Sequence, residues 1–181
     1  RQLLDKFLIY PDFKVLPYSW VATTPLSNFE VNLGGYRDVD DPAITLKLEI
    51  LADAGPARAG DFLLIWTTTP WTLPGNLAAA VGPDIAYVAV DVAGERHWVA
   101  EARLEASGLS PDQVVDRAKG THLLGASYRP PFDYFGEERD RGAFRVIASD
   151  TVTIEDGTGL VHMTPAYGEA DCLALQAAGL D

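Results

Sequence analysis

One short segment constrains the fold of this 181-residue chain more than any other. The five residues FLLIW (62–66) form a continuous apolar run, which is typical of a β-strand buried on both faces. Thr67, Thr68 and Thr69 follow at once, and Pro70 then removes a backbone donor and ends the strand. In extended geometry Thr67 and Thr69 face one side and Thr68 the other. We therefore expect this strand end to offer hydroxyls and unpaired backbone groups to a ligand. On pattern alone, an ordinary strand end and a turn is the simpler interpretation, because threonine favours strands and proline favours turns.

Most of the other periodic segments predict short strands. Strands are expected at residues 44–50, 62–68, 85–92, 96–102 and 144–150, and within 151–163. The first of these, ITLKLEI, alternates apolar and polar residues and predicts one solvent-facing side. The turn Ala93-Gly94-Glu95 predicts one hairpin, and Asp156-Gly157 predicts another.

Helical periodicity is confined to a few segments. These are residues 1–10, which Pro11 ends, 100–107, 111–119 and the last dozen residues. Many short strands with few helices predict an α+β fold that is β-barrel-like, with mostly antiparallel strands and peripheral helices, in a single domain over 1–181. Residues 128–143, with two prolines and dense charge, are expected to form a mobile surface segment. The chain does not begin with Met, so we expect it to be a piece of a longer protein.

The charge balance limits how this chain can bind nucleic acid. Its net charge of −12 has the wrong sign for gripping a polyanion by electrostatics alone. The distribution is uneven, because residues 96–145 hold eight of the fourteen Lys and Arg residues against eight acids. We expect any phosphate contacts to come from this segment, with Arg139 and Arg141 as the residues to test.

The cysteine and histidine content argues against disulfides and zinc. Cys172 is the sole cysteine, so no intrachain disulfide can form. His97, His122 and His162 lie far apart, and no metal-binding spacing is present, so we expect no metal and no cofactor. No apolar run approaches the length of a membrane span, and we expect a cytoplasmic protein.

A second stretch, GTGLVHMTPAYGEAD (157–171), also combines polar side chains with chain breaks. His162 is expected near the end of a strand that Pro165 terminates, and Asp171 in the first turn of the last helix. Both can then point into one crevice. Taken separately, each residue has a simpler explanation, because an acid in a first turn stabilises its helix by about 0.3 to 1 kcal/mol. His162 alone would be an ordinary hydrogen-bonded core histidine.

Together the two stretches point to one family. TTTPWTLPGNLAAAV (67–81) and GTGLVHMTPAYGEAD resemble the two signature segments of the editing, or connective polypeptide, domain inserted in isoleucyl-tRNA synthetases. Residues 16–31, LPYSWVATTPLSNFEV, are similar to the entry region of that domain. The valyl and leucyl relatives typically carry an Arg and an acidic residue where this chain has Thr69-Pro70-Trp71. Thr164 stands where the family usually has Ala, which bears on the pocket wall.

The resemblance implies a substrate and a set of roles. The substrate would be valine esterified to the acceptor end of isoleucine tRNA, and also valyl-adenylate, with isoleucine excluded by size. Asp171 would hold the amino group, and His162 would limit the side chain and orient the adenosine. Thr67, Thr68 and Thr69 would bind the ester and the ribose, while Trp71 and Asn76 would shape the same wall.

The resemblance also implies a reaction and a context. Ordered water would attack the ester directly, helped by a vicinal ribose hydroxyl, with His162 as a candidate base. No segment resembles the HIGH or KMSKS motifs, so this chain is not expected to activate amino acids. The remainder of the synthetase would be its partner, and we expect a monomer.

Two other functions fit parts of the pattern. A non-catalytic module that binds the acceptor end, or spaces a larger enzyme, agrees with the net negative charge. A small-molecule hydrolase using Asp150 and Glu155 is the third hypothesis, although no spacing argument supports it.

Overall fold

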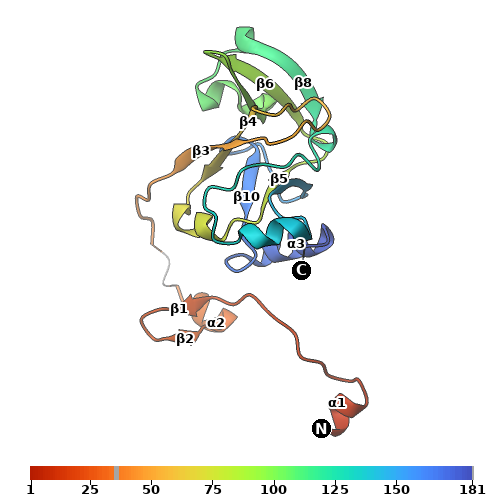
Figure 1. The fold of residues 1–181 in the computed structure, drawn as a ribbon. Helices are drawn as coiled ribbons and strands as arrows, with labels where there is room; N and C mark the ends of the chain where they lie inside the picture. Colours follow the sequence, from red (N-terminus) through yellow and green to blue (C-terminus); the bar gives the residue numbers. More distant parts are fainter. Residues whose placement is uncertain (35–36, 181) are drawn as a thin grey trace. The chain divides into compact units, whose positions relative to one another are not determined.

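The apolar run forms strand β4 (Phe62–Thr67) in the computed structural model, which describes residues 1–34 and 37–180. β4 belongs to a five-stranded sheet in the order β3-β4-β7-β6-β8 (Figure 1). It pairs antiparallel with β3 (Ile44–Glu49) and parallel with β7 (Glu95–Ala100). Residues 63–65 are all buried, which confirms the prediction of a strand covered on both faces.

The far side of this sheet is built from the predicted hairpin. β6 (Ala86–Val92) and β7 pair antiparallel around Ala93 and Gly94, whose φ angles of 56° and 90° suit the tight turn. β8 (Val114–Lys119) pairs antiparallel with the other edge of β6. The hairpin prediction at 85–92 and 96–102 is therefore confirmed.

A second sheet has three strands in the order β10-β5-β9. β5 (Ala78–Val81) pairs antiparallel with β10 (Leu160–Met163) and parallel with β9 (Arg145–Ala148). Every residue of β5 is buried, because small alanine side chains allow the elements on both sides to approach closely.

Side chains from both sheets form one continuous core. Leu63 and Ile65 of β4 belong to the same buried cluster as Ala79 of β5 and Leu160 of β10. The largest fully buried side chains in this cluster include Trp98 of β7. This shared core fixes the end of β4 against β10, and so it brings the two signature stretches together.

Contacts within the chain divide it into two units, Arg1–Asp38 and Val39–Asp181. The described part of the first unit forms the short elements α1 (Gln2–Asp5), β1 (Tyr18–Ser19), β2 (Thr24–Pro25) and α2 (Asn28–Val31). β1 and β2 pair antiparallel, and a capping box between Ser27 and Glu30 begins α2. Neither helix of this unit has a buried residue. The expectation of one domain over 1–181 stays a prediction.

Helical structure in the second unit is mostly short. In its described residues the 3₁₀ helices are η1 (Pro70–Gly75), η2 (Glu101–Arg103), η3 (Glu105–Ser107), η4 (Pro111–Gln113), η5 (Gly120–His122) and η6 (Gly136–Arg141). The last helix, α3 (Glu169–Ala177), is confirmed where the sequence predicts it. The helix predicted at 111–119 is wrong, because β8 occupies most of it. Two adjacent β-branched valines favour the strand, and pairing with β6 satisfies its backbone.

The hairpin predicted within residues 151–163 is also wrong. β10 pairs with β5 and not with the residues before it, and residues 151–159 form turns and bends. Gly157 has a positive φ of 65°, and a Cβ built on it would lie 2.6 Å from Cε3 of Trp66. This glycine therefore permits close packing against β4 and does not close a hairpin.

Two further expectations concern the segment 128–143 and the barrel-like arrangement. The segment 128–143 is not wholly a surface loop, because Tyr128 and Ala143 are buried and residues 136–141 form η6. The two main sheets give an α+β fold of mostly antiparallel pairs, and no closed barrel is found within residues 1–34 and 37–180. The barrel-like arrangement stays a prediction.

Candidate functional site

The end of β4 presents a cluster of hydroxyl groups. Thr67 is the last residue of the strand and is buried, whereas Thr68 and Thr69 are exposed. Thr67 Oγ1 lies 3.3 Å from Thr69 Oγ1 and accepts a hydrogen bond from the Thr69 backbone N–H at 3.1 Å. Thr67 and Thr69 thus share one side of the strand end, as extended geometry predicts. η1 begins at Pro70 and stops the strand.

His162 reaches this cluster from β10. The strand places its buried ring so that Nε2 lies 3.2 Å from Thr72 Oγ1 and 3.4 Å from Thr67 Oγ1. Nδ1 lies 3.2 Å from Thr164 Oγ1. Burial lowers the pKa of His162, so the ring is neutral at pH 7. A neutral ring surrounded by hydroxyls is a rigid hydrogen-bonding wall.

Asp171 approaches from the first turn of α3. Its Oδ2 accepts a hydrogen bond from the Thr164 backbone N–H at 2.9 Å. The ion pairs among residues 1–34 and 37–180 do not include Asp171. Burial raises the pKa of this half-buried carboxyl, and the Thr164 hydrogen bond partly opposes that shift. A carboxylate in this state favours an incoming cation.

These side chains line one pocket of about 430 Å³. Its lining residues are Trp66, Thr67, Thr68, Thr69, Trp71, Thr72, Val161, His162, Thr164, Tyr167 and Asp171. The volume is in the range of small-molecule sites. The structure therefore brings together all of the sequence-predicted site residues except one. Trp71 stands at the rim with 58% of its surface exposed.

The exception is Asn76, which lies outside the lining of this pocket. It is buried, its Nδ2 donates to the Ala78 carbonyl at 2.9 Å, and its Oδ1 accepts from the Tyr128 hydroxyl at 2.7 Å. Both ends of the amide are thus used inside the fold. The prediction that Asn76 shapes the pocket wall is corrected to a role in anchoring the segment after η1.

Sequence reasoning gave no role to Thr72 or Tyr167, and it related Thr164 to the pocket wall without its contact to His162. Thr72 and Thr164 supply the hydroxyls that contact both nitrogens of His162, and Tyr167 lines the opening. Thr72 could have been recognised from the sequence, because it is a fourth threonine that follows Thr67 to Thr69 and lies two residues beyond Pro70 in η1. Asp150 and Glu155 are exposed and do not line the pocket. No group of three His, Cys, Asp or Glu side chains in the described part of the chain is arranged to hold a metal.

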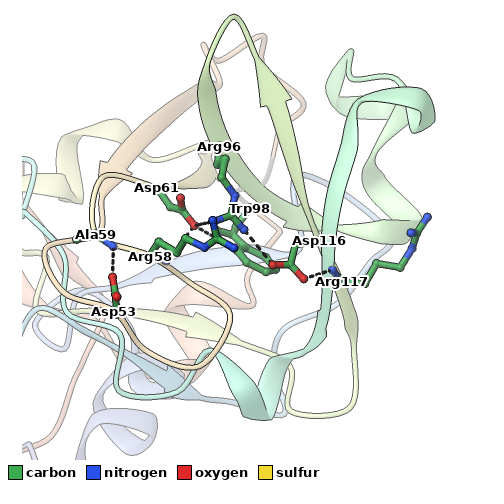
Figure 2. A network of polar contacts seen from close by, with 8 residues as sticks. All are labelled: Asp53, Arg58, Ala59, Asp61, Arg96, Trp98, Asp116 and Arg117. Carbon is green, nitrogen blue, oxygen red and sulfur yellow. Dashed lines mark hydrogen bonds and ion pairs between the residues drawn. The ribbon is translucent and has the colours of Figure 1, made fainter.

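A second polar cluster lies at the opposite end of β4 (Figure 2). Asp61 is 4% exposed, and its Oδ2 accepts from Trp98 Nε1 at 2.9 Å and from the Arg58 backbone N–H at 3.0 Å. Arg96 lies 3.4 Å from Asp61 and 3.1 Å from Asp116. This charge is paired and enclosed, so the cluster supports the fold and offers little to a ligand.

The fold places the chain in a known structural class. It is similar to the CP1 domain of a leucyl-tRNA synthetase, GlLeuRS-CP1, with a TM-score of 0.61 and 20% identity over 77% of this chain and 66% of that one. It also resembles the Plasmodium knowlesi cytosolic leucyl-tRNA synthetase editing domain, with a TM-score of 0.51 and 15% identity over 64% and 50%. The fold is that of a synthetase editing domain.

The sequence comparison is more specific. The isoleucine–tRNA ligases of Bdellovibrio bacteriovorus and Mycobacterium leprae are 48% and 46% identical over 99% of this chain. The chain spans 17% of the length of each of these relatives. No model of a known protein family matches the sequence. Over nearly its whole length, the chain is therefore similar to one segment of isoleucine–tRNA ligases. No helix within residues 1–34 and 37–180 is long and apolar enough to cross a membrane.

Proposed function

We propose that this chain is the editing domain of an isoleucyl-tRNA synthetase and hydrolyses valine from isoleucine tRNA. One observation carries the proposal. The Thr67 to Thr69 hydroxyls, the neutral His162 ring and the Asp171 carboxylate line a single pocket of about 430 Å³. Valyl-adenylate carries the same aminoacyl group and is a second substrate of the same pocket.

The amino group of the substrate binds Asp171. Both the ester and the adenylate carry a free α-ammonium, and a charge-assisted hydrogen bond to a carboxylate is its natural partner. Burial raises the pKa of Asp171, and an ammonium in contact would lower it again by favouring the charged form. The carboxylate is therefore a site that gains most from a cationic ligand.

The wall around His162 separates valine from isoleucine. One methylene in an apolar synthetic site discriminates by only about 1 to 3 kcal/mol, a limit known from this very synthetase family. A second site must then reject the larger side chain by its shape. His162 is buried, and hydroxyls of Thr67, Thr72 and Thr164 lie within 3.4 Å of its nitrogens, so the ring cannot readily move aside.

Hydrolysis follows from positioning. An aminoacyl ester is already activated, so an ordered water can attack it without an acyl-enzyme. Thr68 and Thr69 are exposed at the strand end and face the ester and the terminal ribose. Donors placed where charge develops on the carbonyl oxygen favour the tetrahedral intermediate. The vicinal ribose hydroxyl assists the water.

The remainder of the synthetase delivers the acceptor end. Several exposed cations of residues 96–145 are paired with acids, as in Arg117–Glu101 and Arg141–Glu138. This local pairing agrees with weak tRNA binding by the chain alone. Phosphate contacts from this segment come from residues such as Arg141, and charge reversal there lowers tRNA affinity. Arg139 is less available, because it lies over the Phe144 ring at 5.1 Å.

The proposal is tested by deacylation with the full synthetase that contains this segment. The unaltered enzyme should hydrolyse valyl-tRNA(Ile) much faster than isoleucyl-tRNA(Ile). Asp171→Ala should reduce the valyl rate about 10- to 150-fold, because a hydrogen bond to a charged group contributes about 1.5 to 3 kcal/mol. Glu169→Ala is the matched control, since Glu169 is exposed in the same first turn of α3.

Two outcomes would contradict the proposal. Equal rates on both esters would remove the size discrimination. No deacylation of valyl-tRNA, together with acceptor-end binding that survives, would favour the non-catalytic module instead.

A further inference from the structure

Thr164 contacts both titratable groups on which the proposed function depends, and this inference rests on that function. It follows β10 directly and is only 1% exposed. Its backbone N–H donates to Asp171 Oδ2 at 2.9 Å, and its Oγ1 lies 3.2 Å from His162 Nδ1. One residue thus joins the carboxylate to the imidazole.

The orientation of Thr164 is fixed by packing. A Cβ built on Gly75 would lie 2.8 Å from the Thr164 methyl carbon Cγ2, so this methyl fills the space that a side chain at 75 would need. Threonine is stiff about χ1, and fixing its methyl also fixes its hydroxyl. The single proton of this hydroxyl can go to either of two acceptors, the Thr72 carbonyl oxygen at 3.3 Å or His162 Nδ1 at 3.2 Å.

The hydroxyl of Thr72 favours a proton on Nε2 of His162. Its single proton is donated to the Thr69 carbonyl oxygen at 2.8 Å. Thr72 Oγ1 therefore presents lone pairs to His162 Nε2, 3.2 Å away. If Nε2 carries the proton, it donates a hydrogen bond to Thr72 Oγ1. If Nε2 carries no proton, its lone pair faces the lone pairs of Thr72 Oγ1, and the Thr67 hydroxyl at 3.4 Å would have to donate to it instead.

We infer that Thr164 is a positioning residue: its hydroxyl donates to Nδ1 of His162 and keeps the ring in the tautomer that carries its proton on Nε2. With that proton on Nε2, Nδ1 is an acceptor and needs a donor. The Thr164 hydroxyl lies at hydrogen-bonding distance and is held there by its methyl. A partner on one ring nitrogen sets the role of the other.

This tautomer gives His162 a definite role in the proposed reaction. The nitrogen that faces Thr67 and Thr72 carries a hydrogen and donates. His162 therefore orients and limits the substrate, and it does not accept a proton from the attacking water. The water relies on the ribose hydroxyl of the substrate.

The tautomer is measured directly on the chain by ¹⁵N-histidine NMR, using long-range ¹H–¹⁵N correlations. We expect Nε2 of His162 to be protonated and the Nδ1 resonance to show an accepted hydrogen bond. Thr164→Val, which keeps the shape and removes the hydroxyl, should move Nδ1 toward the position of an unbonded ring nitrogen. Thr164→Ser should keep it in place. A proton on Nδ1 in the unaltered chain would overturn the inference.

Kinetics of the full synthetase test the consequence. Thr164→Val should lower kcat for valyl-tRNA deacylation about two- to tenfold, which is the effect of one lost neutral hydrogen bond, with KM unchanged. Thr164→Ser should restore kcat. Thr158→Val is the matched control, because Thr158 is equally buried and its hydroxyl donates to the Leu160 carbonyl outside the pocket. An unchanged kcat in Thr164→Val would overturn the positioning role.

His162→Gln separates a donor from a base. Glutamine keeps an N–H donor, so we expect kcat to fall by no more than about tenfold, whereas loss of a general base costs about 10² to 10⁴. A loss above 10² would overturn the donor role. If the NMR results hold while no variant or parent enzyme deacylates valyl-tRNA, the proposed function fails and the Thr164–His162 bond stands.

Discussion

The two ends of β4 each have an aspartate nearby, and the two carboxylates differ in how their charge is compensated. Asp61 precedes the strand, is buried, and meets Arg96 together with donors from Trp98 and the backbone. Asp171 lies in the pocket at the other end of the strand and accepts a hydrogen bond from the Thr164 backbone N–H. It forms no ion pair within residues 1–34 and 37–180. The Asp61 charge is compensated by Arg96 within the fold, whereas the Asp171 charge is available to a ligand.

The comparison distinguishes an aspartate that stabilises the fold from an aspartate proposed to bind a ligand, at the two ends of one strand. Enclosed, paired charges hold elements in place, and removing one partner leaves the other buried and uncompensated. A carboxyl whose pKa burial raises, beside a neutral histidine, gains most when a cation arrives. The two ends should therefore respond differently to substitution.

The largest effect is expected for Asp61→Ala. The substitution leaves the Arg96 side chain, which is 15% exposed, without its buried partner, and it removes the acceptor of Trp98 Nε1. We expect a loss of about 3 to 5 kcal/mol in unfolding free energy, measured by urea denaturation. Asp116→Ala, at a more exposed partner of Arg96, should cost less. A loss below 1 kcal/mol for Asp61→Ala would remove the distinction between the two ends.

A smaller loss is expected for Asn76→Ala. The Tyr128 hydroxyl would lose the Oδ1 atom that accepts from it at 2.7 Å, in a buried position. An unsatisfied buried group costs about 1 to 3 kcal/mol, and thermal unfolding should show that loss. Discrimination between valyl and isoleucyl esters by the full synthetase should not change. A change in discrimination without a change in stability would return Asn76 to the pocket.

Part of the fold could be predicted because local patterns determine it. The apolar run at 62–66 and the turn at Ala93-Gly94 carry their own signals, and both elements form as predicted. β5 could not be predicted, because its three alanines, Ala78 to Ala80, have weak strand preference. Their pairing with β9 and β10 stabilises them as a strand. β8 was misassigned although its two valines favour a strand, and its pairing with β6 completes that strand.

The candidate site shows the same division. Thr67, His162 and Asp171 could be chosen from chain breaks and residue type. The contact between His162 and Thr72 could not be predicted, because Thr72 is 90 residues away in the chain and is brought close by the pairing of β10 with β5. Asn76 was misplaced because its partner Tyr128 lies in a segment that looked like a surface loop.

The free energy of unfolding should depend on pH through His162, which lies at the pocket end of β4. Its pKa is lowered in the fold from 6.5, so the unfolded chain takes up a proton first as pH falls. Stability from this group is complete above pH 6.5 and decreases as pH falls toward the folded pKa, by no more than about 1.4 kcal/mol per pH unit. His162→Gln should flatten this part of the curve, measured by denaturation from pH 7.5 to 5. His122→Gln, at an exposed position, is the control. Identical curves for the parent and His162→Gln would contradict the buried neutral ring.

The smallest effect on stability is expected at Asp171, and its sign is opposite. The pKa of Asp171 is raised from 3.8, so the folded chain keeps this proton longer, and stability is lost as pH rises from 3.8 through the folded pKa. Asp171→Asn has no carboxyl to ionise, so this loss is absent. The unfolding free energy of the variant should therefore rise relative to that of the parent as pH rises from 3 to 7. At pH 7 we expect the two to differ by less than about 1 kcal/mol, because the variant also loses its favourable charge at the start of α3.

Glu169→Gln provides the reference for that helix charge, since Glu169 is exposed in the same turn. Subtracting its effect isolates the cost of holding the Asp171 carboxylate in the pocket. If Asp171→Asn instead destabilised the chain by several kcal/mol at pH 7, as expected for Asp61, the carboxylate would be a structural anchor. A carboxylate that costs stability in the empty pocket is stabilised when an ammonium binds beside it, and this is why we propose that Asp171, and not Asp61, binds the substrate.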